Sequence, residues 1–199
     1  MRNSRLRTLI FLALCCDLGL FSKRLISPLA NVITDSLHIP GGIGTSFSLM
    51  FLVVAAAIFP HFGCAAMMGA VQSGLALAFG MVGSMGALSW IGYIVPGIAI
   101  DCCMAAGRKV RLPASERVIL ANGIAAPCAA LTANAIVFHL RGVVLMLYLS
   151  VSVTSGVICG MLGAQLVRRL LPVLGRNLES DRNSKSPAHR RAGGRQSAL

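Results

Sequence analysis

The sequence predicts an all-α integral membrane protein, a six-transmembrane-helix bundle with both termini in the cytoplasm. Its 199 residues are 56% hydrophobic and only 12% charged, whereas a soluble domain carries about 25% charged residues. Nearly unbroken apolar stretches cover residues 43–106 and 118–171, and each exceeds the roughly 20 residues that one helix needs to cross a bilayer. The net charge of +12 lies mainly at the chain ends and in one loop, as expected for a membrane protein with basic cytoplasmic segments.

The first predicted transmembrane helix covers residues 6–21. Arg2, Arg5 and Arg7 come before or at its start, and an apolar run follows them. Secretory signal peptides share these features, but no small-x-small cleavage site follows this apolar run. We therefore expect the segment to remain in the membrane as a helix.

An amphipathic segment, residues 22–45, separates this helix from the long apolar block. Its apolar residues recur at helical spacing, which gives one apolar and one polar face. We expect an interfacial helix that caps the outer mouth of the bundle; the alternative is a solvated connecting loop. The segment carries Lys23, Arg24, Asp35 and His38 and ends at Pro40, Gly41 and Gly42.

Five more helices are predicted from the positions of helix-breaking residues in the apolar block. The breaks fall around Pro60, at the glycines of residues 80–86, in the basic loop 107–117 and around Gly142. The predicted helices cover residues 43–59, 62–82, 87–106, 118–140 and 143–171. The membrane domain then spans residues 1–175, and the polar, basic residues 176–199 form a disordered cytoplasmic tail.

The distribution of basic residues tests this helix count. With six spans, most of the 18 Lys and Arg residues fall in the N-terminal arm, the 107–117 loop and the C-terminal tail. Only Lys23, Arg24 and Arg141 are left outside, as the positive-inside rule requires for a multi-pass protein of the plasma membrane. No basic surface is interleaved with aromatic residues, so we expect no nucleic acid as a partner.

Polar residues within or beside the apolar spans are the candidate binding residues, because an ionised side chain at the centre of a bilayer costs at least about 2.5–3.5 kcal/mol. In the six-helix arrangement they fall in the outer half of the membrane. We expect them to form an outward-facing pocket with aromatic walls, suited to a small polar or heteroaromatic solute. They are Asp17, Asp35, His38, Gln72, Trp90, Tyr93, Asn134 and His139.

Several of these residues have structural alternatives. Trp90 and Tyr93 lie three residues apart, hence on one helix face, and could equally belong to an interfacial aromatic belt. Asp17 could form an ion pair with Lys23 or Arg24.

Other polar residues are expected to be structural or solvated. His139 could be solvated beside the outer surface. Asp101 is expected to pair with Arg108 or Lys109, and Asn122 to bond a neighbouring helix.

Enzyme chemistry finds no support in the sequence. The nucleotide-binding pattern GxxxxGK[ST] is absent, and the few polar residues form no Ser-His-Asp or metal-ligand pattern. The seven cysteines lie in apolar segments without a CxxC pair and are expected to be packing residues. We therefore predict no catalytic residue, no metal and no cofactor.

Small residues at four-residue spacing are frequent, as in Gly156, Gly160 and Ala164 or in Ala65 and Gly69. Such residues let helix backbones approach closely in lipid. We expect them to pack helices within the bundle; the alternative is that one such face docks a separate membrane subunit.

The segments ANVITDSLHIPGGIGTSFSLMF, MGAVQSGLALAFGMVGSMGALSWIGYIVPG and GMLGAQLVRRLLPVLGR, together with the six-helix plan, resemble a substrate-binding S component of an energy-coupling factor (ECF) transporter. The subgroup associated with hydroxymethylpyrimidine and thiamine uptake is most similar, over most of residues 6–176. The resemblance implies capture of a vitamin or related solute from outside. It also implies assembly with a transmembrane coupling protein and two cytoplasmic ATPases, and a first loop that helps close the pocket.

One expected feature of that family is missing. An AxxxA face on the first helix often meets the coupling protein, but here the nearest pairs are Ala13 with Asp17 and Cys15 with Gly19. Two other readings therefore stay open. One is a small secondary carrier or channel that works alone, although the spans lack buried carboxylate chains and repeated broken helices. The other is a membrane assembly protein that transports nothing.

Overall fold

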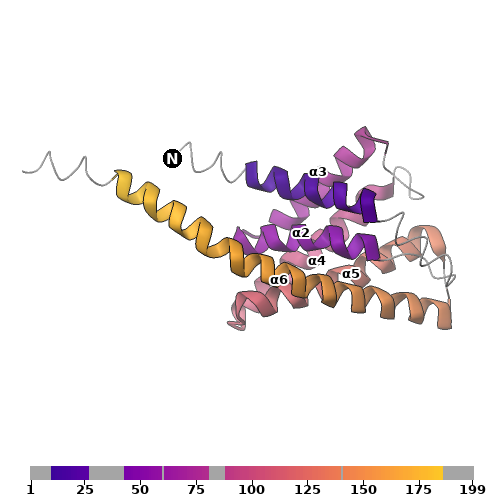
Figure 1. Ribbon diagram of the computed structural model, residues 1–199. Helices are drawn as coiled ribbons and strands as arrows, with labels where there is room; N and C mark the ends of the chain where they lie inside the picture. Colours follow the sequence, from indigo (N-terminus) through magenta and orange to yellow (C-terminus); the bar gives the residue numbers. More distant parts are fainter. Residues whose placement is uncertain (1–9, 27–42, 60, 81–87, 140, 186–199) are drawn as a thin grey trace, which may run out of the picture.

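The computed structural model describes residues 10–26, 43–59, 61–80, 88–139 and 141–185, and the side chains as far as residue 172. These residues form helices joined by short turns, with no strand among them (Figure 1). The all-α fold class is thereby confirmed. The elements are the N-terminal helix (residues 10–26), α2 (Ile43–Ile58), α3 (Cys64–Ala78), α4 (Ser89–Lys109), α5 (Ala114–Ala133), the π-helical turn η2 (Asn134–Phe138) and α6 (Val143–Lys185).

Three helices are long and apolar enough to cross a membrane, judged by length and composition. They are α4, the segment Ala114–Val137 of α5 and η2, and the segment Val143–Pro172 of α6. Gly44–Ile58 and Cys64–Ala78 are shorter apolar helices. The chain thus has the character of a membrane-embedded protein, while six complete spans and their orientation stay predictions.

The N-terminal helix reaches further than expected. It continues to residue 26, so Lys23 and Arg24 belong to it and do not begin a separate interfacial helix. No proline interrupts the chain before Pro28, and the helix therefore has no reason to end at residue 21. Residues 27–42 lie outside the described residues, and with them the predicted cap and its Asp35 and His38.

The last helix also exceeds its predicted end. α6 runs from Val143 to Lys185, so residues 176–185 of the predicted disordered tail are helical. Hydrophobicity ends near residue 171, but polar side chains alone do not stop a helix, and α6 continues through Pro172, which lies inside it. Residues 186–199 lie outside the described residues.

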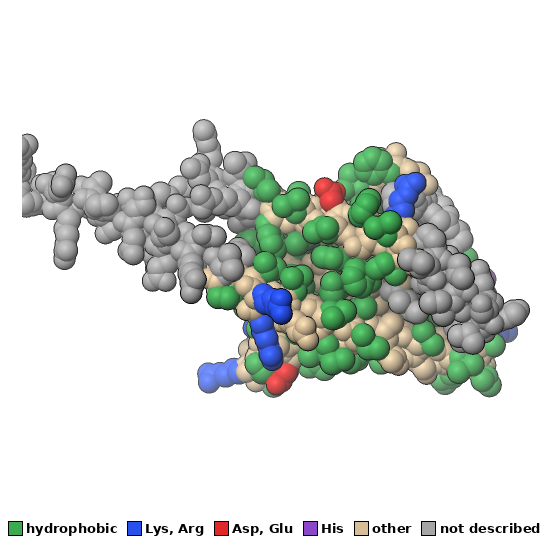
Figure 2. Space-filling model, viewed as in Figure 1, with side chains coloured by type: hydrophobic (Ala, Val, Ile, Leu, Met, Phe, Trp, Pro, Cys, Tyr) green, Lys and Arg blue, Asp and Glu red, His purple; other side chains and the backbone are tan. Residues whose placement is uncertain are grey.

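The helices run back and forth between two ends of the bundle. The start of the N-terminal helix and the end of α6 lie at one end, and the α5–α6 connection lies at the other (Figure 1). We call the first the basic end, because the last turn of α4 holds Arg108 and Lys109 there and Arg168 of α6 donates to Ser115 Oγ at 3.2 Å. Figure 2 shows hydrophobic side chains over the face between the two ends.

The core is centred on α2. Leu52, Val53 and Ala55 are 0% exposed and are surrounded by the other helices. This position explains why α2 reads as an almost continuous apolar sequence, since a helix enclosed on all sides needs no polar face.

Small residues set the closest helix crossings. A Cβ atom on Gly156 would lie 2.9 Å from the Asn122 carbonyl oxygen, and one on Gly160 would lie 2.9 Å from Ile119 Cα. A Cβ on Gly69 of α3 would meet the Tyr93 carbonyl oxygen at 2.5 Å. These glycines let α6 pack on α5 and α3 pack on α4, so internal packing is confirmed for them.

Candidate functional site

One predicted ion pair is replaced by a helix cap. The buried Asp101 carboxylate of α4 accepts hydrogen bonds from the backbone N–H groups of Ala65 at 3.2 Å and Ala66 at 2.9 Å. The expected pairing with Arg108 or Lys109 is therefore wrong. The N-cap residue of α3 provides no side-chain hydrogen bond to the first N–H groups of the helix. The Asp101 carboxylate provides these bonds, and its negative charge interacts favourably with the positive N-terminal end of the helix dipole.

Two of the predicted binding residues meet at a small cavity of about 20 Å³. Gln72 of α3 and Tyr93 of α4 line it together with Lys23 of the N-terminal helix. That volume holds about one water molecule. The other described lining residues are Thr45, Ser48, Leu49, Gly92, Pro96 and Ala129.

Gln72 is held in place by the N-terminal helix. Its side chain is 1% exposed, and its Nε2 donates to the Cys16 carbonyl oxygen at 3.1 Å. A Cβ atom on Gly19 would lie 2.6 Å from the same nitrogen, so glycine at position 19 is what lets the amide fit. A buried amide needs such a partner because an unpaired one is costly in an apolar bundle.

Lys23 and Tyr93 form the most polar wall of the cavity. Lys23 Nζ donates to the Tyr93 hydroxyl oxygen at 3.0 Å and lies 4.5 Å from the centroid of the tyrosine ring. The sequence offers Lys23 as an ion-pair partner of Asp17, whereas the structure gives it contacts with Tyr93.

Pro96 interrupts the backbone hydrogen bonding of α4 beside this cavity. Proline has no N–H group, so the helical hydrogen bond from residue 96 to the carbonyl of Gly92 cannot form. Both residues line the cavity. The backbone of α4 is thereby less completely bonded at the point where the polar side chains converge.

The remaining described candidates do not line this cavity. Trp90 is 46% exposed, and Asp17 and His139 are exposed. Asn134 lies in η2, where its carbonyl oxygen accepts the His139 N–H at 2.8 Å. His139 then takes φ 48°, a left-handed conformation that ends the helix.

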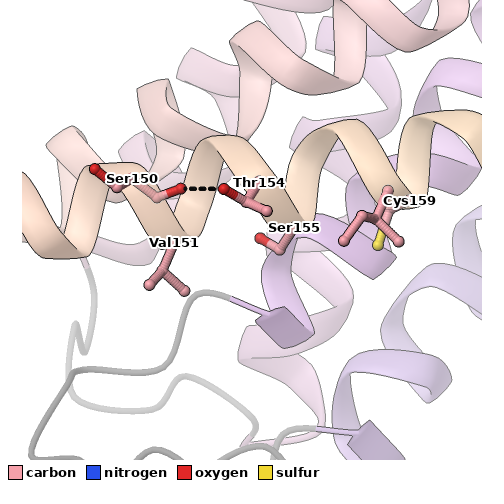
Figure 3. A pocket seen from close by; sticks show the side chains of 6 residues that line it. Ser150, Val151, Thr154, Ser155 and Cys159 are labelled. Carbon is pink, nitrogen blue, oxygen red and sulfur yellow. Dashed lines mark hydrogen bonds between the residues drawn. The ribbon is translucent and has the colours of Figure 1, made fainter.

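A larger cavity of about 400 Å³ lies along α6, at residues that the sequence reading did not select. It is lined by Ser150, Val151, Thr154, Ser155, Ile158 and Cys159 (Figure 3). The available signal was the run of hydroxyl residues 150, 152, 154 and 155 in an otherwise apolar span.

The hydroxyl groups of this cavity are already engaged. Ser150 Oγ donates to the Met146 carbonyl oxygen and Thr154 Oγ1 to the Ser150 carbonyl oxygen, both at 2.8 Å. Ser155 Oγ and Ser46 Oγ lie 2.8 Å apart and join α6 to α2. Because these groups bond helix partners, the cavity offers a ligand mainly apolar contact.

Asn122 makes the predicted bond between helices. Its Nδ2 donates to the Gly156 carbonyl oxygen at 2.7 Å and approaches the Ser46 carbonyl oxygen at 3.5 Å. The side chain therefore connects α5 with both α6 and α2, next to the close crossing at Gly156.

No group of three or more His, Cys, Asp or Glu side chains that could hold a metal ion occurs in the part of the chain that the structure describes. No protein-family model, curated protein or solved structure matches the chain. The interpretation of its function therefore rests on its own residues.

Proposed function

We propose that this protein is the membrane-embedded, solute-binding S component of an ECF-type importer. In this role it captures a vitamin or related small solute outside the cell. Both termini are in the cytoplasm, and a transmembrane coupling protein with two cytoplasmic ATPases drives release inside. The sequence has no GxxxxGK[ST] nucleotide-binding pattern, which agrees with a role in which partner subunits supply the energy.

The observation that carries the proposal is the meeting of Lys23, Gln72 and Tyr93 at one cavity. These residues come from three separate helices of a bundle in which polar groups are scarce. Bringing polar side chains together in a lipid environment costs free energy, which binding of a polar ligand can offset. The cavity lies away from the basic end, on the side that the positive-inside rule assigns to the exterior.

The size of the cavity implies that binding needs movement. About 20 Å³ is far too small for a vitamin, because pockets for such ligands measure roughly 300–1,000 Å³. Opening would separate Lys23 from Tyr93, the contact that now joins the N-terminal helix to α4. A loss of one cation–π contact and one hydrogen bond costs only about 1–3 kcal/mol, which a bound solute can offset.

The test is affinity purification of the protein from its native membranes in mild detergent, followed by mass spectrometry of co-purifying proteins and retained small molecules. Two ATPases with a membrane coupling protein, and a retained solute, are the expected result. A retained solute without partners would favour a solitary carrier. Neither solute nor partners, in a detergent shown to preserve a known complex of this kind, would contradict the proposal.

A further inference from the structure

Lys23 brings the only full charge among the described residues that line the small cavity. Its ammonium group is partly buried, with its nitrogen 3.0 Å from the Tyr93 hydroxyl oxygen and 4.5 Å from the ring centroid. Both of these partners are neutral. A charge withdrawn from water is stabilised fully only by an opposite charge with hydrogen bonds. Among the described residues, no carboxylate contacts Lys23, and its contacts with Tyr93 supply no negative charge.

The hydrogen-bonding groups around Lys23 also favour a negatively charged ligand. An ammonium group has three N–H donors, and Tyr93 takes one of them. Because the tyrosine oxygen accepts from Lys23, its own O–H proton remains to be donated to another group. The Gly92 carbonyl is a neutral acceptor and does not balance a full charge. The cavity therefore presents a cation and a hydroxyl donor, and an anion could bind both.

We propose that the solute bound here carries an anionic group, a carboxylate, which pairs with Lys23 and accepts the hydroxyl proton of Tyr93. This inference rests on the proposed function and specifies its substrate class. The cavity of about 20 Å³ has room for about one oxygen atom of such a group, since it holds about one water molecule. The remainder of the solute enters only when the cavity opens. A cationic solute such as thiamine would instead meet a like charge.

The test measures binding of matched probes to the purified protein in detergent. Pyridine, pyrimidine and benzene rings are each offered with a carboxylate, a carboxamide or an aminomethyl substituent. The chain has one tryptophan, Trp90, which lies three residues from Tyr93, and equilibrium dialysis checks any binding that its fluorescence indicates. Only carboxylates are expected to bind, and Lys23→Gln should weaken their binding about thirtyfold or more.

Matched variants separate charge from folding. Lys23→Arg retains the cation and should keep most of the affinity, and Tyr93→Phe should lose part of it through the missing hydroxyl. Arg24→Gln removes the same charge from an exposed neighbour and should leave affinity unchanged. Thermal unfolding without probe checks that each variant is folded.

The outcomes distinguish this inference from the proposed function. If no carboxylate binds, if neutral or cationic probes bind the unmodified protein as tightly as carboxylates, or if Lys23→Gln leaves carboxylate binding unchanged, the anionic substrate class is wrong. A retained solute without an acidic group, found together with the coupling protein and ATPases, would overturn the inference and leave the importer standing. Absence of both solute and partners would remove the proposed function itself.

Discussion

Single polar side chains hold this apolar bundle together by bonding the backbone of another helix. Asp101 bonds the start of α3, Gln72 bonds the N-terminal helix, and Asn122 bonds α6. Apolar contacts between helices are weakly specific in lipid, whereas a buried polar group tolerates few alternative partners. These residues therefore determine which helices are neighbours.

Replacing Asp101 should destabilise the protein. The Asp101→Ala change removes the acceptor for two buried N–H groups of α3, and hydrogen bonds to a charged group are worth about 1.5–3 kcal/mol. We expect a lower free energy of unfolding by about that amount, measured by denaturant unfolding in detergent micelles. Asp101→Asn should lose less, because it retains one acceptor oxygen.

Glu116→Gln is the matched control for this change, since Glu116 is an exposed acidic residue in the first turn of α5. It should alter the unfolding free energy by less than about 0.5 kcal/mol. Equal stability of the Asp101→Ala and Glu116→Gln proteins would show that the cap is dispensable.

Tyr93 and Trp90 should behave differently although they are three residues apart. Tyr93 lines the cavity with Lys23, and Trp90 is 46% exposed. Tyr93→Ala should therefore weaken binding of the retained solute about tenfold or more, equivalent to about 1.4 kcal/mol, as measured by equilibrium dialysis. Trp90→Ala should leave affinity nearly unchanged. Equal losses would mean that both aromatic side chains contact the solute.

At the scale of the helices, close packing depends on where small residues face a neighbour. Gly160 faces the backbone of α5, because an added Cβ would lie 2.9 Å from Ile119 Cα. Gly74 of α3 has no atom within 4 Å of the same position. The four-residue spacing of small residues identifies candidates for close contact, and the neighbouring helix decides which of them matter.

The Gly160→Ala and Gly74→Ala changes add the same methyl group and should have opposite effects. Gly160→Ala should force α5 and α6 apart and reduce stability by about 1–3 kcal/mol. Gly74→Ala should be neutral or stabilising by up to about 1 kcal/mol, since alanine favours the helix. Thermal or denaturant unfolding of the two variants checks this. If Gly74→Ala destabilised the protein and Gly160→Ala did not, the assignment of Gly160 to the close contact between α5 and α6 would be wrong.

At the scale of the whole molecule, the arrangement of charge predicts its orientation. Arg108 and Lys109 lie at the same end of the bundle as Arg168. Lys23 contacts Tyr93 beside the small cavity, away from this basic end. Cytoplasmic segments of membrane proteins carry an excess of basic residues. The basic end is therefore expected inside the cell.

Reporter fusions in bacterial cells can test this orientation. Truncation after residue 112 should give a fluorescent cytoplasmic reporter and an inactive phosphatase, and truncation after residue 141 should give the opposite pair. The charge-reduced variant Arg108→Gln/Lys109→Gln is expected to weaken the preference, because fewer positive charges hold the loop inside. Phosphatase activity at residue 112 would reverse the topology.

The sequence by itself determined the all-helical class, the membrane character and the approximate position of each described helix. These properties depend on local features, namely the length of apolar runs and the placement of glycine and proline. It was less successful at helix ends, because the predicted ends followed the loss of hydrophobicity, whereas the helices continue to residue 26 and to Lys185. It also identified Gly156 and Gly160 as packing residues, because their spacing alone places them on one helix face.

Only the tertiary structure decided which distant residues meet. Asp101 lies 35 or 36 positions from the N–H groups it bonds, and Lys23 lies 70 positions from Tyr93. Partners so far apart in the chain are set by how helices cross, which no local pattern encodes. For the same reason the sequence could not foretell that, among the described candidates, Gln72 and Tyr93 meet with Lys23 at one small cavity, or that a larger cavity lies along α6.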